Sequence, residues 1–427
     1  MSSSTYLERE ISAIWAIDNH THMGRLWRYD KPVDFKKKVS SIVRYLIEKP
    51  SAKLKVGGGA LLPLREFEYR EIINALKALY GFESDLITKE YAEELTSKIL
   101  DSRMKGLAYV YSNALDKAGI DIALINTPEL RRELDKKRFK WVPFVDQFLY
   151  PLKKANAYLR VKATWTFERF EKELDFIYQK ANVQPETFDD YLSLVEGELK
   201  EYKNKGAVAV KFWSAFFRSL YFSKVDEAEA KKVFKWYMSN EPLTETEYVR
   251  LQDFIARKVL SICRDLNLPV HIHVGFGLAN DVITLSNSSP INLENIAEDK
   301  SFEELKIVLI HGGYPYVREA GSLARMRENV FIDFSWLPVL IPPSELSFIL
   351  REWIAWKLED KLLFGTDAVE APWGTDDLLC VYGARQARKA LTITLSKMID
   401  DHILSPNEAV TIAKKALREN ALELYNF

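Results

Sequence analysis

Residues 14–22 read Ile-Trp-Ala-Ile-Asp-Asn-His-Thr-His. A short apolar run that ends in polar residues predicts a buried strand over 14–19. Side chains alternate along a strand, so His20 and His22 point to the same side and can share one metal ion. Alternation also brings two histidines together on any half-buried strand, so this motif alone does not separate a metal site from ordinary packing.

Seven further short apolar runs follow, and longer amphipathic or charged stretches separate them. Eight buried strands alternating with helices are typical of a (β/α)8 TIM barrel. The strands are expected at 14–19, 120–126, 141–145, 207–212, 269–274, 307–310, 330–334 and 361–364. The sequence therefore predicts an α/β protein with one barrel over residues 1–427.

Two connections are too long for a plain barrel of about 250 residues. They cover residues 28–118, after the first strand, and 151–205, after the third, and both are predicted to be helical insertions. Because each follows a strand, each is expected over the C-terminal face, where barrel active sites lie. They are candidate lids or homodimer surfaces.

Helix-end signals agree with these boundaries. Gly119 and Gly206 each stand between a charged stretch and a strand, where a C-terminal glycine cap belongs. Three pairs have the spacing of a capping box: Thr244 with Glu247, Ser301 with Glu304, and Ser405 with Glu408.

Composition excludes several classes of protein. The net charge is −1, from 60 basic and 61 acidic residues, which argues against a nucleic-acid-binding surface. Hydrophobic residues make up 47% and charged residues 28%, as in globular proteins. The two cysteines do not form a disulfide framework, and no apolar run approaches the roughly 20 residues that span a bilayer. We expect a cytoplasmic protein with no membrane partner.

Five of the six histidines lie in or just after three predicted strands. His273 falls at the end of the fifth strand, His311 directly follows the sixth, and Asp367 follows the eighth. In a barrel the C-terminal ends of all strands meet at one rim. Imidazoles with a carboxylate suit zinc or another first-row divalent ion, so the pattern predicts a metal-dependent active site.

Three other polar residues lie in these strands. Lys211 follows an apolar run, and it can carry a carboxylated side chain that bridges two metals, hold a substrate carboxylate, or pair with Asp18 or Asp121. His271 is expected to act behind the metal ligands or on substrate. Asp18 either orients a ligand histidine or pairs with a neighbouring strand.

Three motifs resemble a known family. Residues 311–320 read His-Gly-Gly-Tyr-Pro-Tyr-Val-Arg-Glu-Ala, 275–277 read Gly-Phe-Gly, and 365–367 read Gly-Thr-Asp. With the histidines above, they resemble the metal-dependent amidohydrolase superfamily over nearly the whole chain. They are most similar to its amidohydrolase-related branch, which includes the amidohydrolase-like half of fungal and plant proteins fused to a glutamine synthetase.

The resemblance implies a distorted barrel and a divalent metal ion, expected to be one zinc per chain. The ligands it implies are His20, His22, His273 and Asp367, with His311 beside the metal as a ligand or proton-transfer group. Binuclear members usually carry a carboxylated lysine. Here bulky residues follow Lys211, so the related branch favours a single metal and an uncarboxylated lysine.

The leading hypothesis is hydrolysis of an amide, ester or lactone of a small anionic substrate by metal-activated water. Asp367 would take the proton of the water, and His311 would protonate the leaving group or stabilise the oxyanion. Lys211 and Arg318 would hold a substrate carboxylate. Trp213, Tyr316 and Trp336 would wall the pocket, although ordinary packing explains these aromatic side chains equally well.

Two alternatives remain open. Metal-dependent, non-oxidative decarboxylation uses the same ligands, and release of carbon dioxide distinguishes it from hydrolysis. A non-catalytic metal-binding or regulatory barrel is the alternative from another class, because barrels host many functions.

Overall fold

The computed structural model describes residues 3–25, 35–48, 54–56, 59–61, 65–152, 165–239, 241–277, 283–370 and 375–427. The chain divides into two compact units. The first comprises residues 1–26, 30–140 and 333–427, and the second comprises 27–29 and 141–332. Within the described ranges, no helix combines the length and the apolar character needed to cross a membrane.

In the first unit, β1 (Ala16–Thr21) has a strand partner on each side. It pairs in parallel with β4 (Ile120–Asn126). On its other side the Asn19 amide donates to the Phe364 carbonyl at 2.8 Å, next to β10 (Leu362–Leu363). Every residue of β1 is buried, so the four polar residues from Asp18 to Thr21 need partners inside the protein.

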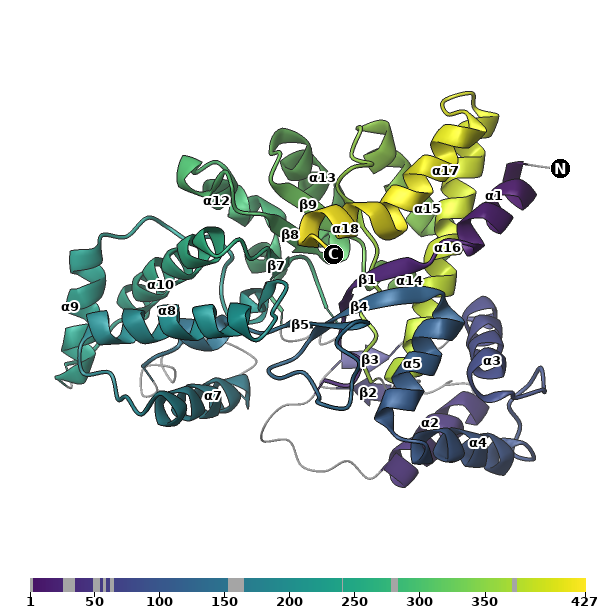
Figure 1. Ribbon diagram of the computed structural model, residues 1–427, viewed down its shortest axis with the longest axis horizontal. Helices are drawn as coiled ribbons and strands as arrows, with labels where there is room; N and C mark the ends of the chain where they lie inside the picture. The colour runs from purple at the N-terminus through teal and green to yellow at the C-terminus, as the bar shows by residue number, and fades with distance from the viewer. Residues whose placement is uncertain are drawn as a thin grey trace. The chain divides into compact units, whose positions relative to one another are not determined.

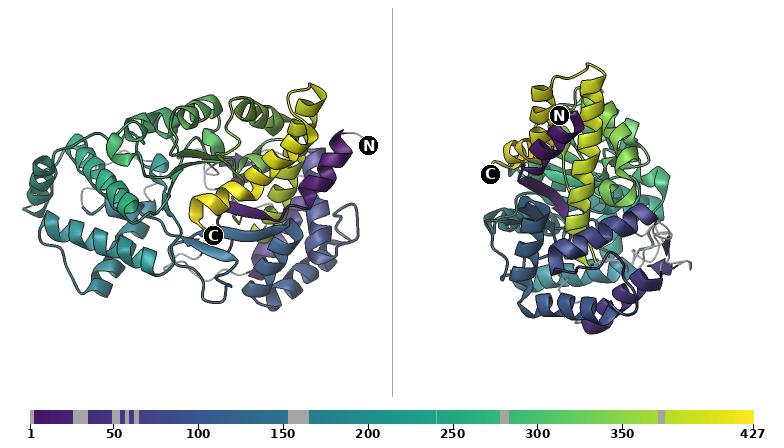
Figure 2. Two further views of the ribbon diagram at one scale, coloured as in Figure 1. Left: turned by 45° about the horizontal axis from the view of Figure 1, so that its top comes forward. Right: turned by 90° about the vertical axis from the view of Figure 1, so that its right-hand side faces the viewer.

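The helices of the first unit surround the long helix α16 (Asp376–Asp400), which contacts α1, α3, α5 and α15 (Figures 1 and 2). Most residues of α16 are buried, so it is a core helix. The other helices are α1 (Ser3–Ser12), α2 (Phe35–Glu48), α3 (Glu66–Tyr80), α4 (Ala92–Met104), α5 (Leu107–Ala118), α14 (Leu337–Leu340), α15 (Pro343–Ala355), α17 (Pro406–Lys414), the π-helical turn Lys415–Glu419 and α18 (Asn420–Tyr425).

The first insertion also holds a small hairpin. Strands β2 (Leu54–Val56) and β3 (Gly59–Leu61) pair antiparallel. The prediction that residues 28–118 are helical therefore holds for α2 to α5 but is wrong at this hairpin. Strands of three residues are too short to produce a period-2 pattern in the sequence.

The second unit contains a parallel ladder. Neighbours β6 (Val210–Phe212), β7 (Val270–His273) and β8 (Ile307–Ile310) pair in register, and β9 (Val330–Asp333) pairs with β8. A parallel bridge joins Trp141 of β5 (Phe139–Val142) to Ala207. The division between the two units falls inside β5 and β9.

Helices of several lengths complete the second unit. Four of them belong to the second insertion or precede β7 and are grouped together in Figure 1: α7 (Trp165–Ala181), α8 (Phe188–Asn204), α9 (Glu227–Met238) and α10 (Glu245–Asp265). The rest are α11 (Leu285–Ser288), α12 (Glu294–Ala297), α13 (Val317–Met326) and the 3-10 turns Asp146–Leu149, Ser214–Phe216, Pro290–Leu293, Lys300–Phe302 and His311–Gly313.

The predicted fold class, a distorted α/β barrel with long insertions, is confirmed. All eight predicted strands occur in the expected order, and two of them, β4 and β8, have the predicted bounds.

The capping boxes at Thr244 and Ser405 are present, and Gly119 adopts the left-handed conformation at the end of α5. The box at Ser301 is wrong, because Asp299 instead caps a short 3-10 turn there. The wider domain assignment stays a prediction.

Candidate metal centre

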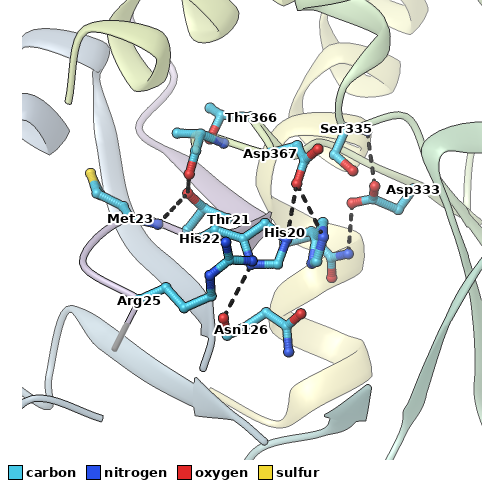
Figure 3. A network of polar contacts seen from close by, with 12 residues as sticks. His20, Thr21, His22, Met23, Arg25, Asn126, Asp333, Ser335, Thr366 and Asp367 are labelled. Atoms are coloured by element: carbon cyan, nitrogen blue, oxygen red, sulfur yellow. Dashed lines mark hydrogen bonds and ion pairs between the residues drawn. The ribbon is translucent and has the colours of Figure 1, made fainter. Parts of the chain in front are cut away.

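The first unit brings together His20, His22 and Asp367 (Figure 3). The Nε2 atoms of His20 and His22 lie 3.3 Å and 3.4 Å from the same oxygen, Oδ1 of Asp367. The two imidazole rings are 4.9 Å apart at their centroids and nearly perpendicular. Two nitrogen donors and one oxygen donor therefore converge, as the His-x-His motif and the aspartate after the eighth strand predict.

A backbone carbonyl fixes the orientation of the His22 ring. Nδ1 of His22 lies 3.2 Å from the carbonyl oxygen of Asn126, at the end of β4 (Figure 3). A carbonyl can only accept, so Nδ1 carries the proton and Nε2 keeps its lone pair toward Asp367. This is the hydrogen-bond pattern that commonly orients a metal-ligating histidine.

The Asp367 backbone is held in an unusual conformation. Its φ is +49°, which is left-handed and uncommon outside glycine, and its amide donates to the His20 carbonyl at 2.8 Å. Strain of this kind persists only where surrounding contacts enforce it, and it concentrates at functional sites. The strain therefore supports a functional role for Asp367.

Asp18 accepts hydrogen bonds from the residue next to Asp367 and from His20. Its carboxylate accepts the Thr366 amide at 2.9 Å, the Thr366 hydroxyl at 2.5 Å and, more weakly, the His20 amide at 3.3 Å. Burial raises the pKa of Asp18 to about 7, although the Thr366 hydrogen bonds oppose this shift. Of the two roles considered for Asp18, the structure favours orientation of the ligand segments.

Asn19, next to His20 in the sequence, takes part in a second network of buried hydrogen bonds. The Asn19 amide group donates to Oδ2 of Asp333 at 2.7 Å, and the Tyr425 hydroxyl donates to the Asn19 side-chain oxygen. A Cβ on Gly365 would lie 2.9 Å from Oδ2 of Asp333 and 2.7 Å from Cβ of Ser335. Gly365, part of the motif that resembles the amidohydrolases, is therefore required for close approach.

The donor set of the first unit fits a divalent metal ion. Two imidazoles and a carboxylate are ligands that zinc and other first-row ions prefer. The His20 side chain is buried, those of His22 and Asp367 are 14% and 11% exposed, and the three donor atoms lie close enough together to hold one cation. The alternative without a metal is a histidine–aspartate ion pair, in which one of the two imidazoles carries a positive charge.

The second unit contains a buried lysine and a buried histidine on neighbouring strands. Lys211 on β6 stands in register with His271 on β7, and both are buried. Burial and the Lys211 charge hold the pKa of His271 well below its ordinary value. His271 is therefore neutral at pH 7 and can both donate and accept a hydrogen bond.

His273 and His311 lie against each other in the second unit. Their ring centroids are 4.6 Å apart, and the Phe216 ring packs on His273 at 4.7 Å. His311 has φ +72°, a second strained non-glycine residue at a strand end. A Cβ on Gly277 would lie 3.0 Å from the His273 ring, so glycine leaves room for that imidazole.

Two sequence motifs of the second unit meet directly. The Phe276 amide donates to the Tyr314 carbonyl at 2.9 Å, and the two rings lie 5.3 Å apart. A Cβ on Gly275 would come within 2.2 Å of the same carbonyl oxygen. The Gly-Phe-Gly and His-Gly-Gly-Tyr-Pro-Tyr stretches therefore pack directly against each other. This contact fixes the segments that follow His273 and His311.

Sequence reasoning missed Asp146. This buried carboxylate accepts the Trp213 amide at 2.6 Å and the Ser214 hydroxyl at 2.7 Å. Burial raises its pKa to about 7, and the positive charge of Lys211 partly offsets that rise. Asp146 therefore fixes the turn that follows Lys211. An aspartate just after a strand is common in turns, so the sequence carried no distinctive signal.

The other predicted pocket residues differ in exposure. Trp213 is half-buried and packs against the rings of Phe144, Phe216 and Phe217, whereas Tyr316 is half-buried at the start of α13. Arg318 is exposed in the first turn of that helix. Trp336, in the first unit, is buried and has φ +67°. Their roles toward a substrate stay predictions.

Comparison with known proteins supports the same family. Residues 238–427 match the family model described as amidohydrolase. Protein fluG of Emericella nidulans is 29% identical over 183 residues, which are 41% of this chain and 20% of that protein. The C-terminal part of the chain is therefore similar to the amidohydrolase family. It spans only one fifth of the length of the curated relative that it matches.

Solved structures share the fold of this protein. A Lactobacillus casei protein described as a metal-dependent hydrolase has a TM-score of 0.67 at 19% identity, and the match covers 98% of this chain and 97% of that one. A uronate isomerase from Thermotoga maritima has a TM-score of 0.69 at 14% identity and covers 100% and 97%. A glucuronate isomerase from Caulobacter crescentus has 0.67 at 12% and covers 99% and 94%. At these identities the likeness establishes the architecture.

Proposed function

We propose that this protein is a member of the amidohydrolase superfamily and a metal-dependent hydrolase of an amide, ester or lactone of a small anionic substrate. The observation that carries the proposal is the convergence of His20 and His22 on one oxygen of Asp367. We propose His273 as the fourth ligand, one metal ion per chain, and zinc as that ion. The superfamily and the donor chemistry support this set.

A bound zinc ion would supply an activated water at neutral pH and polarise the substrate carbonyl. In this proposal Asp367 would orient that water and accept its proton on a carboxylate oxygen. His311 then donates a proton to the leaving group, or stabilises the negative oxygen that develops on the substrate. The strained backbone of Asp367 and the brace from Asp18 hold the accepting oxygen in place before substrate arrives.

Lys211 supports an anionic substrate. A buried ammonium group is costly unless it meets a negative charge, and a substrate carboxylate would supply one. Asp121, one pairing partner considered for Lys211, forms an ion pair with Arg418 at 2.9 Å. We propose that Lys211 holds a substrate carboxylate, with Arg318 as a second cation.

Metal content tests the ligand set. Elemental analysis of wild type, purified without added metal, is expected to give about one zinc per chain, and the His20→Ala/His22→Ala variant should lose it. His402→Asn is the matched control, because His402 is exposed and already has the positive φ that asparagine accepts. About two ions per chain would assign Lys211 as a carboxylated bridge. No metal after reconstitution would refute the proposal.

Product analysis tests the reaction. Candidate anionic lactones, amides, esters and uronates are incubated with the zinc-loaded protein in ¹⁸O-water. Hydrolysis places one labelled oxygen in the product acid, whereas release of carbon dioxide would show decarboxylation and rearrangement without acyl label would show isomerisation. Asp367→Asn should remove nearly all turnover and keep the fold. Full turnover in that variant would refute the assigned role of Asp367.

A further inference from the structure

A pair of adjacent carboxylates lies buried in the first unit, away from the proposed metal ligands. Asp376 and Asp377 occupy the first turn of α16, and both side chains are almost completely buried. Acidic residues are favourable at a helix N-terminus, but two neighbouring buried charges need a cation as well. Arg103 of α4 supplies it, with Nη2 at 3.3 Å from Asp376 and 2.7 Å from Asp377.

Tyrosine side chains on two further helices of the first insertion donate hydrogen bonds to Asp376 and Asp377. The Tyr80 hydroxyl, at the end of α3, donates to Asp377 at 2.6 Å. The Tyr111 hydroxyl, on α5, donates to Oδ2 of Asp376 at 2.9 Å. Burial raises the pKa of both tyrosines well above the ordinary value, so both hydroxyls stay protonated donors at neutral pH.

Among the described residues, Asp376 and not Asp377 forms a hydrogen bond with residues 22–25, which we call the histidine loop. Oδ2 of Asp376 accepts the Gly24 amide at 2.9 Å, and Gly24 stands two residues after His22. The Gly24 carbonyl accepts from Nε of Arg131 at 2.8 Å. A Cβ on Gly24, whose φ is +70°, would lie 2.7 Å from the Tyr111 ring. Gly24 is therefore held by the Asp376 carboxylate and lies close to the Tyr111 ring.

We propose that Asp376 is a positioning residue for His22 and that the helical insertion serves to hold the histidine loop through it. This inference rests on the proposed metal-binding function. Asp376 fixes the Met23–Gly24 peptide, one residue beyond His22, while the Asn126 carbonyl fixes the His22 ring. Together they hold Nε2 in the direction of Asp367, and a preformed ligand binds metal more tightly than one that must be ordered on binding.

The neighbouring carboxylate provides a matched control. Asp376→Ala and Asp377→Ala each remove one of the two acceptors of Arg103, so both should lower the melting temperature by similar amounts. Only Asp376→Ala releases Gly24. Zinc affinity of the apo protein, measured by competition with a chelator, should fall about tenfold in Asp376→Ala and less than about twofold in Asp377→Ala. Equal losses in the two variants would overturn the proposal.

A conservative variant separates the hydrogen bond from the charge. Asp376→Asn keeps an oxygen that can accept the Gly24 amide, so its zinc affinity should return to within about threefold of wild type. The absorption spectrum of the Co²⁺-loaded protein should be altered in Asp376→Ala and wild-type-like in Asp376→Asn. An Asparagine variant as weak as the alanine variant would contradict a role for the hydrogen bond.

Hydrogen exchange of the metal-free protein tests the clamp independently of metal. Amide exchange over residues 22–25 should be faster in Asp376→Ala than in Asp377→Ala or wild type. If wild type binds no metal, the proposed function fails, and the exchange result still decides whether the clamp exists. If Asp376→Ala does not fold, Gly24→Ala replaces it, because that change displaces the loop and leaves both carboxylates in place. Unchanged zinc affinity in Gly24→Ala would overturn the proposal.

Discussion

Asp146 should make the protein less stable as the pH rises, and Asp146→Asn should remove this dependence. Burial raises the pKa of Asp146 from 3.8 to about 7 in the folded protein. Between these values the folded state keeps a proton that the unfolded chain has released, so the free energy of unfolding falls with increasing pH. A difference of about three pKa units corresponds to about 4 kcal/mol, lost between about pH 4 and pH 7.

The asparagine variant keeps both hydrogen bonds of Asp146. Its side-chain oxygen can accept the Trp213 amide, and its side-chain NH2 can donate to the Ser214 oxygen once that hydroxyl turns away. The packing and the hydrogen bonds therefore stay as in wild type, and the titrating charge is gone. Relative to wild type, the variant should gain up to about 4 kcal/mol on going from acidic to neutral pH.

Urea unfolding at intervals between pH 4 and pH 8 measures this difference. Asp101→Asn, an exposed change on α4, is the control and should follow wild type across the range. A difference between wild type and Asp146→Asn that stays constant with pH would refute the reasoning. A wild type that gains stability relative to the variant as pH rises would show that Lys211 outweighs burial and keeps Asp146 ionised.

Three further substitutions test the packing around the histidines. Gly365→Ala forces a Cβ against Asp333 and Ser335, so it should lower the free energy of unfolding by about 1–3 kcal/mol and reduce the zinc content of purified protein. Tyr425→Phe removes the donor to the Asn19 side-chain oxygen and should cost about 1–3 kcal/mol in urea unfolding, whereas a loss below about 0.5 kcal/mol would show that the buried oxygen finds another donor. Gly277→Ala presses on the His273 ring and should weaken zinc binding in competition titrations, and unchanged affinity would argue against His273 as a ligand.

The strand positions could be predicted because buried parallel strands are short, nearly continuous apolar runs. The bounds of β4 and β8 agree with the sequence for this reason. The first strand was displaced by two residues, since Ile14 and Trp15 extend the apolar run although the strand begins at Ala16. An apolar side chain in a turn before a strand gives the same pattern as one within the strand.

The residues of the candidate site could be predicted in part. His20, His22 and Asp367 stand out because histidines are rare in this chain and fall at strand ends. Asp146 and Asp376 could not be found in this way. An aspartate after a strand or in the first turn of a helix has ordinary local explanations, and only the tertiary contacts with Trp213 and Gly24 distinguish these two.

The pairing of β1 has a consequence for the newly made chain. The residues that hold β1 on one side, Phe364 and Asp367, and the Tyr425 hydroxyl that reaches Asn19 are synthesised long after the histidines. While the ribosome is still translating the middle of the protein, β1 can pair only with β4. His20 and His22 therefore emerge well before their carboxylate partner, and a metal captured at that stage would be held by the two imidazoles alone. For the proposed metal site, we therefore expect selection of the ion only after Asp367 has been synthesised.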